Sequence, residues 1–200
     1  IELADDTVLD LLNVSQPVQL CSGGDGCFHA YPVVEPIVNS LEELLALGLF
    51  GQDVRATSAT GVHDASSRSH SLLRLYVYPP APSQSDELAS AEGVLNLIDL
   101  AGSEHRIDSM YHNAERRREG GHINKSLSAL KECVRIRSTV RGNGEAKEMP
   151  GHHYRKSKLT MLLKGSFTLP SAKTVIIATV SPASKDTEHS LNTLRHACIM

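Results

Sequence analysis

Apolar residues along the chain follow two kinds of spacing, and each predicts one kind of element. Short apolar or alternating runs predict β-strands at residues 2–12, 72–78, 94–100 and 174–180. Spacings of three and four predict helices around Leu41/Leu44/Leu45, Ile123/Leu127/Leu130/Val134, Leu159/Leu162/Leu163 and Leu191/Leu194/Cys198. Because strands and helices alternate, the pattern favours an α/β sandwich around a mostly buried central sheet.

Local signals set the expected ends of these elements. Ser40 and Glu43 have the spacing of a capping box, so a helix should begin there. Gly48 is the expected end of that helix, with a further helical stretch possible from Gly51 towards Arg55. The Pro- and Ser-rich residues 79–92 and the aperiodic residues 140–153 are predicted loops.

Length and charge narrow the class of protein. The 200 residues suffice for one domain or most of a larger one, and no apolar run approaches the roughly 18 residues of a membrane span. The first residues lack the profile of a secretory signal, which favours an internal segment of a longer cytosolic protein with reduced thiols. Residues 1–50 hold eight acidic and no basic residues, whereas 104–164 hold 14 of the 20 Lys and Arg against seven acids. A basic block of this size either binds an acidic partner or forms ordinary solvated helix faces.

Two short motifs carry candidate chemistry. Asp99 ends the predicted strand 94–100 and is followed by Ala101 and Gly102. Nucleotide-hydrolysing α/β proteins place an acid there for Mg²⁺, and a glycine lets a backbone N–H approach a terminal phosphate. The sequence Ser-Ser-Arg-Ser-His at 66–70 offers hydroxyls for Mg²⁺ and phosphate and an Arg that could pair with an acid. Taken singly, a capping Asp and a Ser-rich turn are the simpler explanations of these two motifs.

Taken together and in order, six segments resemble the kinesin motor domain over essentially the whole chain. The Ser-Ser-Arg-Ser-His motif is similar to the first switch loop, and Leu-Ile-Asp-Leu-Ala-Gly-Ser-Glu at 97–104 is similar to the second. The other four similar segments are residues 2–12 (opening strand), 123–130 (relay helix), 154–163 (microtubule-facing loop and helix) and 190–197 (last helix).

The resemblance implies a three-layer α/β sandwich with a central, mostly parallel sheet, the P-loop NTPase-like kinesin motor fold. It covers about the C-terminal half to three-fifths of such a motor, so we expect one partial motor domain over residues 1–200, with the N-terminal part missing. The family's phosphate-binding loop, Gly-x-x-x-x-Gly-Lys-Ser/Thr, is not in this sequence and would lie upstream of Ile1. A coiled coil would also lie outside the segment.

By the same resemblance, ATP and Mg²⁺ are the expected cofactors. Ser66 and Ser67 would contact the γ-phosphate and Mg²⁺, and Asp99 would hold Mg²⁺ through water. The Gly102 N–H would sense the γ-phosphate, and Arg68 and Glu104 would pair to close the switches around the attacking water.

The resemblance also assigns a partner to the basic block, namely the acidic surface of tubulin in the microtubule. The basic residues that fall in tubulin-facing segments are Arg116, Arg117, Arg118, Lys125, Lys131, Arg135, Arg137, Arg155 and Lys158, of which Arg155 and Lys158 match motif positions. We therefore expect a location on cytoplasmic microtubules and no binding to nucleic acid or membrane, because no aromatic stacking platform or reading helix supports a nucleic-acid partner. Oligomeric state stays open.

Several positions depart from the family pattern. His63 stands where the first switch usually has Asn, Ala4 where Tyr is usual, and His105 where a fixed positive charge is more usual. The segments 130–135 and 191–195 resemble the internal-motor kinesins, which depolymerise microtubule ends. Two interpretations remain: part of an ATP-driven motor or depolymerase, or a non-catalytic microtubule-binding module without a phosphate-binding loop. In either case the 200-residue chain by itself should have negligible ATPase activity.

Overall fold

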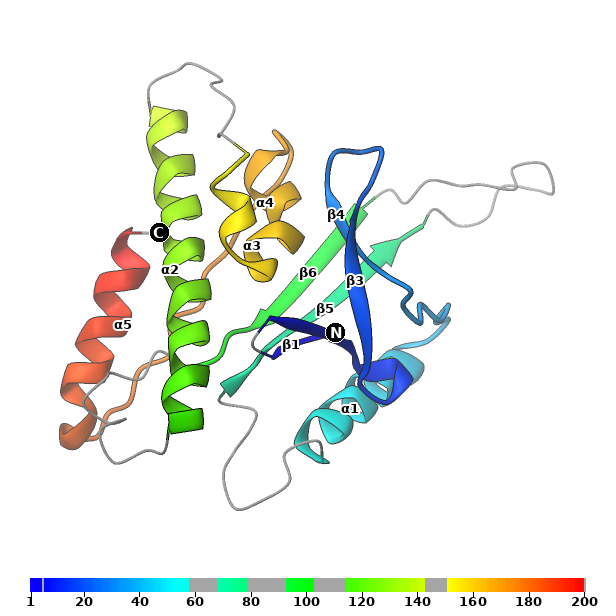
Figure 1. Ribbon diagram of the computed structural model, residues 1–200, viewed down its shortest axis with the longest axis horizontal. Helices are drawn as coiled ribbons and strands as arrows, with labels where there is room; N and C mark the ends of the chain where they lie inside the picture. Colours follow the sequence, from blue (N-terminus) through cyan, green and yellow to red (C-terminus); the bar gives the residue numbers. More distant parts are fainter. Residues whose placement is uncertain (5, 58–67, 79–92, 103–113, 143–150, 200) are drawn as a thin grey trace.

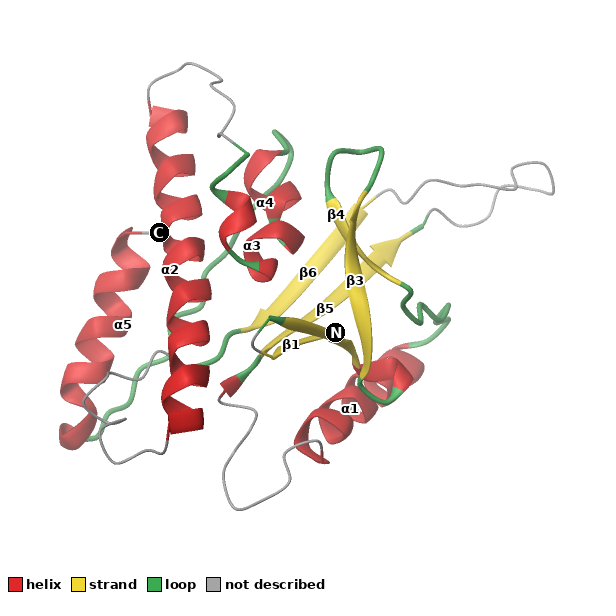
Figure 2. Cartoon of the chain, in the orientation of Figure 1, coloured by secondary structure: helices red, strands yellow, loops and turns green. Residues whose placement is uncertain are grey.

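The strands of the protein form one sheet, which lies beside a long helix. The computed structural model describes residues 1–4, 6–57, 68–78, 93–102, 114–142 and 151–199 (Figure 1). Six strands form the sheet in the order β4-β3-β2-β1-β5-β6 (Figure 2). Their bounds are β1 Glu2–Ala4, β2 Thr7–Asp10, β3 Gln16–Ser22, β4 Phe28–Tyr31, β5 His70–Val77 and β6 Gly93–Asp99.

Every strand pair within the described residues is antiparallel, so the prediction of a mostly parallel sheet is not confirmed. The single strand predicted at 2–12 is in fact two short strands, β1 and β2, which pair with each other. A 3₁₀ turn, η1 Leu11–Asn13, follows them because the Asp10 carboxylate accepts the Leu12 N–H and caps it. Short sequential strands of this kind pair antiparallel through tight connections, which a parallel pair does not allow.

The helices agree with the predicted ones in place but differ in length. They are α1 Leu41–Thr57, α2 Ala114–Gly142, α3 Lys158–Leu162, α4 Lys164–Thr168 and α5 Thr187–Ile199, with 3₁₀ turns η3 Tyr154–Lys156 and η4 Ser184–Asp186. The α2 stripe of Ile123, Leu127, Leu130 and Val134 is buried as its spacing predicts. None of the helices in the part of the chain described here is long and apolar enough to cross a membrane.

Helix α1 begins where the capping box predicts but does not end at Gly48. The Ser40 hydroxyl accepts the Glu43 N–H, and the Glu43 carboxylate reaches back to the N–H of Asn39. The helix runs through Gly48 and Gly51 to Thr57. A glycine inside a helix costs only about 1 kcal/mol relative to Ala. Buried contacts of Arg55 near the end of the helix offset that cost, and local sequence does not reveal them.

The strand predicted at 174–180 does not form in this structure. Its side chains are exposed, with Val175 and Ile177 each 85% accessible to solvent. A strand needs a neighbour for its backbone N–H and C=O groups, and no described residue pairs with this segment. The strand prediction is therefore wrong for this structure, because an apolar run does not by itself supply a partner strand.

The register shows that helices pack on both faces of the central strands. Glu2, Ser71 and Asp99 lie opposite one another on β1, β5 and β6, so they share a face, and it is the face that Arg55 of α1 contacts. Leu3 and Leu72 point to the other face. There they form the core with residues of α2, η3, α3 and α4, namely Leu130, Cys133, Val134, Tyr154, Leu159, Leu162, Leu163 and Phe167.

Candidate functional site

Asp99, the predicted metal-binding acid, stands at the end of β6 and is held by a buried arginine. Arg55 Nη1 donates to Asp99 Oδ2 at 2.8 Å and to Ser71 Oγ at 3.3 Å. The same guanidinium donates from Nε to Ser69 Oγ and from Nη2 to the Ser69 carbonyl. Arg55 is 6% exposed, whereas the Asp99 side chain is 67% exposed. The arginine therefore fixes one carboxylate oxygen and leaves the group open to solvent.

A second acid balances the buried charge of Arg55. Glu2 is 5% exposed and its Oε1 lies 3.8 Å from Arg55 Nε. Ser69 Oγ donates to the same Glu2 oxygen at 2.6 Å, which joins the start of β1 to the segment that precedes β5. A buried ion pair is tolerated only when such hydrogen bonds satisfy its remaining atoms. The network thus fixes the ends of three strands where Asp99 stands.

Sequence reasoning missed Arg55, although one signal was present. It is the first Lys or Arg of the chain, and the next is Arg68. A lone cation in a long acidic stretch is a candidate for a buried ion pair. The possible helical stretch from Gly51 towards Arg55 did not reveal its role, because local sequence does not show that Glu2 and Asp99 lie beside it.

The residues predicted for ATP and Mg²⁺ are only partly within the described structure. Ser66, Ser67 and Glu104 lie outside it, as do His63 and His105. Arg68 is half-buried just before β5, and Gly102 is half-buried three residues after Asp99. Within the described ranges no group of three or more His, Cys, Asp or Glu could hold a metal ion. One solvent-open carboxylate fits a Mg²⁺ bound through water better than a closed cage.

Basic residues gather in an open groove between α2 and η3. Lys125 and Arg155, both predicted, are exposed and line this groove of about 490 Å³ together with Lys156. Glu132 also lines the groove, and its carboxylate contacts Lys156 Nζ and His153 Nδ1. These hydrogen bonds, that of Lys156 first, lower the pKa of Glu132 and keep it ionised. Glu132 therefore holds Lys156 in place and leaves Lys125 and Arg155 as the outward charges.

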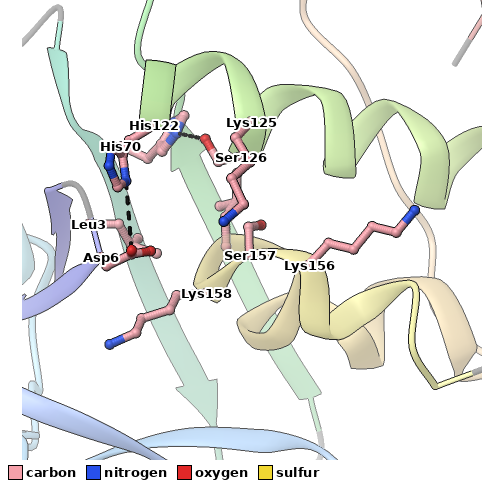
Figure 3. Close-up of a pocket in the computed structure, with 10 residues that line it drawn as sticks. Leu3, Asp6, His70, His122, Lys125, Ser126, Lys156, Ser157 and Lys158 are labelled. Atoms are coloured by element: carbon pink, nitrogen blue, oxygen red, sulfur yellow. Dashed lines mark hydrogen bonds and ion pairs between the residues drawn. The ribbon is translucent and has the colours of Figure 1, made fainter. Parts of the chain in front are cut away.

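Lys125 also lines a small hollow of about 20 Å³, and Lys158 lines the same hollow (Figure 3). This hollow is lined by residues of the β1–β2 connection, of α2 and of the start of α3, among them Asp6, His122 and Ser157. His122 Nδ1 lies 3.7 Å from Asp6 Oδ2. Lys125 lines both the groove and the hollow, so the structure places it near Arg155 and near Lys158.

Three other predicted basic residues do not join this region. Lys131 and Arg135 are on α2 but line neither the groove nor the hollow, and burial lowers the pKa of Lys131. Arg137 has a structural role instead, because its guanidinium donates to the carbonyls of Ser166 and Ala172 and to the Thr174 hydroxyl. It ties α2 to the chain that follows α4. Helix α2 includes Arg116, Arg117 and Arg118, for which the structure describes the backbone only.

Comparisons with known proteins agree with this architecture. The family model described as "Kinesin motor domain" matches residues 1–200. Diatom spindle kinesin-1 of Cylindrotheca fusiformis is 39% identical over 196 residues, 98% of this chain and 29% of its own length. Kinesin-like protein KIN-13B of Arabidopsis thaliana is 37% identical over 198 residues, 98% of this chain and 27% of its own length.

Solved structures give the same result. A KIF14 dimer with AMP-PNP in complex with a microtubule has a TM-score of 0.75 and 32% identity, over 99% of this chain and 55% of that one. The chain thus spans under a third of the two curated relatives and about half of the solved chain. With its whole length matched by the family model, this chain belongs to the kinesin motor domain family.

Proposed function

We propose that the chain forms the track-binding, nucleotide-responsive part of an ATP-driven microtubule motor. One observation carries the proposal: the same helix, α2, supplies the basic groove and follows the β6 strand that ends in Asp99. An acid for the nucleotide's metal and a cationic surface for a polyanionic track are thus on consecutive elements. In support, solved relatives of similar fold are described with AMP-PNP or ADP in complex with a microtubule.

In this proposal, Asp99 holds Mg²⁺ through water, and Arg55 sets the orientation of its carboxylate. Bound Mg²⁺ supplies charge neutralisation at the β- and γ-phosphates of ATP. Ser66 and Ser67 bind phosphate and metal, Gly102 offers its N–H to the γ-phosphate, and Arg68 pairs with Glu104 to close the site. The phosphate-binding loop comes from outside the 200 residues. The work of these groups is positioning and electrostatic stabilisation.

Lys125, Arg155 and Lys158 are proposed to contact the acidic surface of tubulin in the microtubules of the cytoplasm. Exposed cations on neighbouring elements form such contacts without a deep pocket, and they speed association through long-range attraction. The energy of ATP hydrolysis would drive either movement along the microtubule or depolymerisation of its ends. Both outcomes use the same groove.

The test is ATP turnover by the full-length protein with and without microtubules. We expect microtubules to stimulate turnover and expect the double variant Lys125→Glu/Arg155→Glu to weaken microtubule binding by about 10–100-fold. The matched control is Lys185→Glu, which alters an exposed lysine on η4. Microtubule binding without any turnover would favour the non-catalytic module, and equal competition by duplex DNA would refute the assignment of the groove to tubulin.

A further inference from the structure

A buried imidazole joins the end of the sheet to the long helix. His70 opens β5 and is 4% exposed. Its Nδ1 lies 3.0 Å from the backbone nitrogen of Ala101, and its Nε2 lies 2.7 Å from Ser126 Oγ (Figure 3). Ala101 is in the segment that leaves β6, and Ser126 is on α2. The His70 side chain therefore hydrogen-bonds both to the segment after β6 and to helix α2.

The hydrogen bonds allow only one tautomer of His70. The Ala101 N–H can only donate, so Nδ1 must carry a lone pair. Ser126 Oγ lies 2.7 Å from the Ile123 carbonyl, which can only accept, so the hydroxyl proton points there. Ser126 must then accept from His70 Nε2–H. The bonds form one directed series from Ala101 through His70 and Ser126 to Ile123.

Burial, with a smaller contribution from the nearby Arg55 guanidinium, lowers the pKa of His70 to about 4, and the Asp99 charge opposes this only in part. The ring is therefore neutral at physiological pH, as the series of bonds requires. An imidazolium could not accept the Ala101 N–H.

Apolar packing joins the same two segments independently. Ala101 is 4% exposed and forms a small buried cluster with Ile123 and Leu127 of α2. The residue before Gly102 is therefore held to α2 by its methyl group and, through His70, by its backbone N–H. Two kinds of contact at one place leave little room for the strand end and the helix to move separately.

We propose that His70 is a positioning residue that couples the main chain at 101–102 to helix α2. A displacement at Gly102 then moves the first turns of α2 and, with them, Lys125, which neighbours Ser126. This inference rests on the proposed function for its consequence, because Gly102 and Lys125 have their roles there. The link itself stands on the hydrogen bonds and the apolar cluster.

The experiment uses four variants of the full-length protein. Ser126→Ala removes the helix side of the link, and Ser126→Thr keeps the hydroxyl and should restore it. His70→Asn keeps an acceptor near Nδ1 but is too short to reach Ser126. Ser184→Ala is the control, because Ser184 is exposed on η4 and lines neither the groove nor the hollow.

The first readout is the ratio of microtubule-stimulated to basal ATP turnover. We expect Ser126→Ala and His70→Asn to lower this ratio about tenfold, with the KM for ATP within about twofold of the parent value. Ser126→Thr and Ser184→Ala should keep the parent ratio. A merely structural role would not separate stimulation from KM, so unchanged ratios in both Ser126→Ala and His70→Asn would overturn the proposal.

The second readout is hydrogen exchange at the Ala101 amide, followed by mass spectrometry in the same proteins and in His70→Gln. His70→Gln removes the acceptor at Nδ1 and should speed exchange at Ala101 about tenfold, whereas Ser184→Ala should not. Exchange at the parent rate in His70→Gln would overturn the link. This arm needs no turnover, so a parent protein without ATPase activity would refute the proposed function and still leave the link decided by exchange.

Discussion

The two faces of the central strands are built from alternate residues of the same short segments, yet they differ in chemistry. On one face Leu3 and Leu72 pack against α2, α3 and α4 and exclude water. On the other face Glu2, Ser71 and Asp99 surround the guanidinium of Arg55 from α1. The apolar face therefore stabilises the fold by burial, whereas the polar face ties the ends of three strands together through a buried charge and also orients one solvent-open carboxylate.

The largest expected effect comes from the polar face. Replacing Arg55 by Met should lower the free energy of unfolding by about 3–5 kcal/mol, because the buried Glu2 then loses its compensating charge. Urea unfolding of the 200-residue chain measures this, with Arg195→Met as the exposed control, for which we expect a change below about 0.5 kcal/mol. A loss in Arg55→Met no larger than in the control would show that the polar face does not stabilise these strands.

The next effect is on the apolar face. Leu72→Ala should cost about 2–4 kcal/mol, since Leu72 is 3% exposed in the core. Leu73 is the matched control, because it is the next residue on β5, points to the other face and is 40% exposed. Leu73→Ala should cost well under half as much in the same unfolding experiment. Equal losses in the two variants would contradict the register of β5 described here.

A smaller effect on stability is expected from pH, through His70, whose pKa is influenced by Arg55 and Asp99 on the other face. Because the pKa of His70 falls from 6.5 to about 4 on folding, the unfolded chain takes up a proton that the folded chain does not in this range. The contribution to stability is complete above pH 6.5 and is lost as pH falls towards 4, by about 2 kcal/mol between pH 7 and 5.

The measurement is the difference in unfolding free energy between the parent and His70→Gln across this range. The charged groups near His70 are Asp6, His122 and Lys125 in the hollow and Arg55 and Asp99 on the other face. They are present in both proteins, so their own effect on the pH dependence of stability cancels in the difference. The difference should shrink as pH falls. A difference that is constant from pH 7 to 5 would show that His70 titrates normally.

The sequence predicts the features that depend on a single segment better than those that depend on a distant partner. Patterns that depend on one segment and its immediate neighbours were correct: β5, β6, the α2 stripe, α5 and the cap at Ser40. Lys125 also lies near Arg155 in the groove and near Lys158 in the hollow. These features follow from period, capping and motif order alone.

Features that depend on a distant partner were missed or mistaken. The role of Arg55 requires Glu2 and Asp99, which are 53 and 44 residues away in the chain. Arg137 was assigned to a tubulin-facing segment by the resemblance, and its hydrogen bonds to the carbonyls of Ser166 in α4 and Ala172 beyond it were not foreseen. The mostly parallel sheet was inferred from the alternation of strands and helices and from the family resemblance, and the strand at 174–180 from its apolar run. Neither kind of signal says which strands of this chain pair.

The smallest effect on the free energy of unfolding is expected at residues 174–180, which pair with no described strand. It tests the difference between packed and solvent-exposed apolar residues. Ile177→Thr should change the unfolding free energy of the 200-residue chain by less than about 0.5 kcal/mol, because the side chain is 85% exposed there. The buried site for comparison is Val134 on α2, which is 7% exposed. Val134→Thr also replaces a β-branched apolar residue by Thr, but it places the hydroxyl in the core and should cost about 1–3 kcal/mol.

The decisive measurement repeats Ile177→Thr in the full-length protein. This chain covers 55% of the length of a solved relative, and the exposed apolar side chains at 174–180 lead us to expect that further residues of the full-length protein cover this segment. Limited proteolysis or hydrogen exchange would then show residues 174–180 protected in the full-length protein and open in the 200-residue chain. Equal exposure in both would mean that the apolar run at 174–180 is a surface feature of this protein, and the strand prediction would fail for a second time.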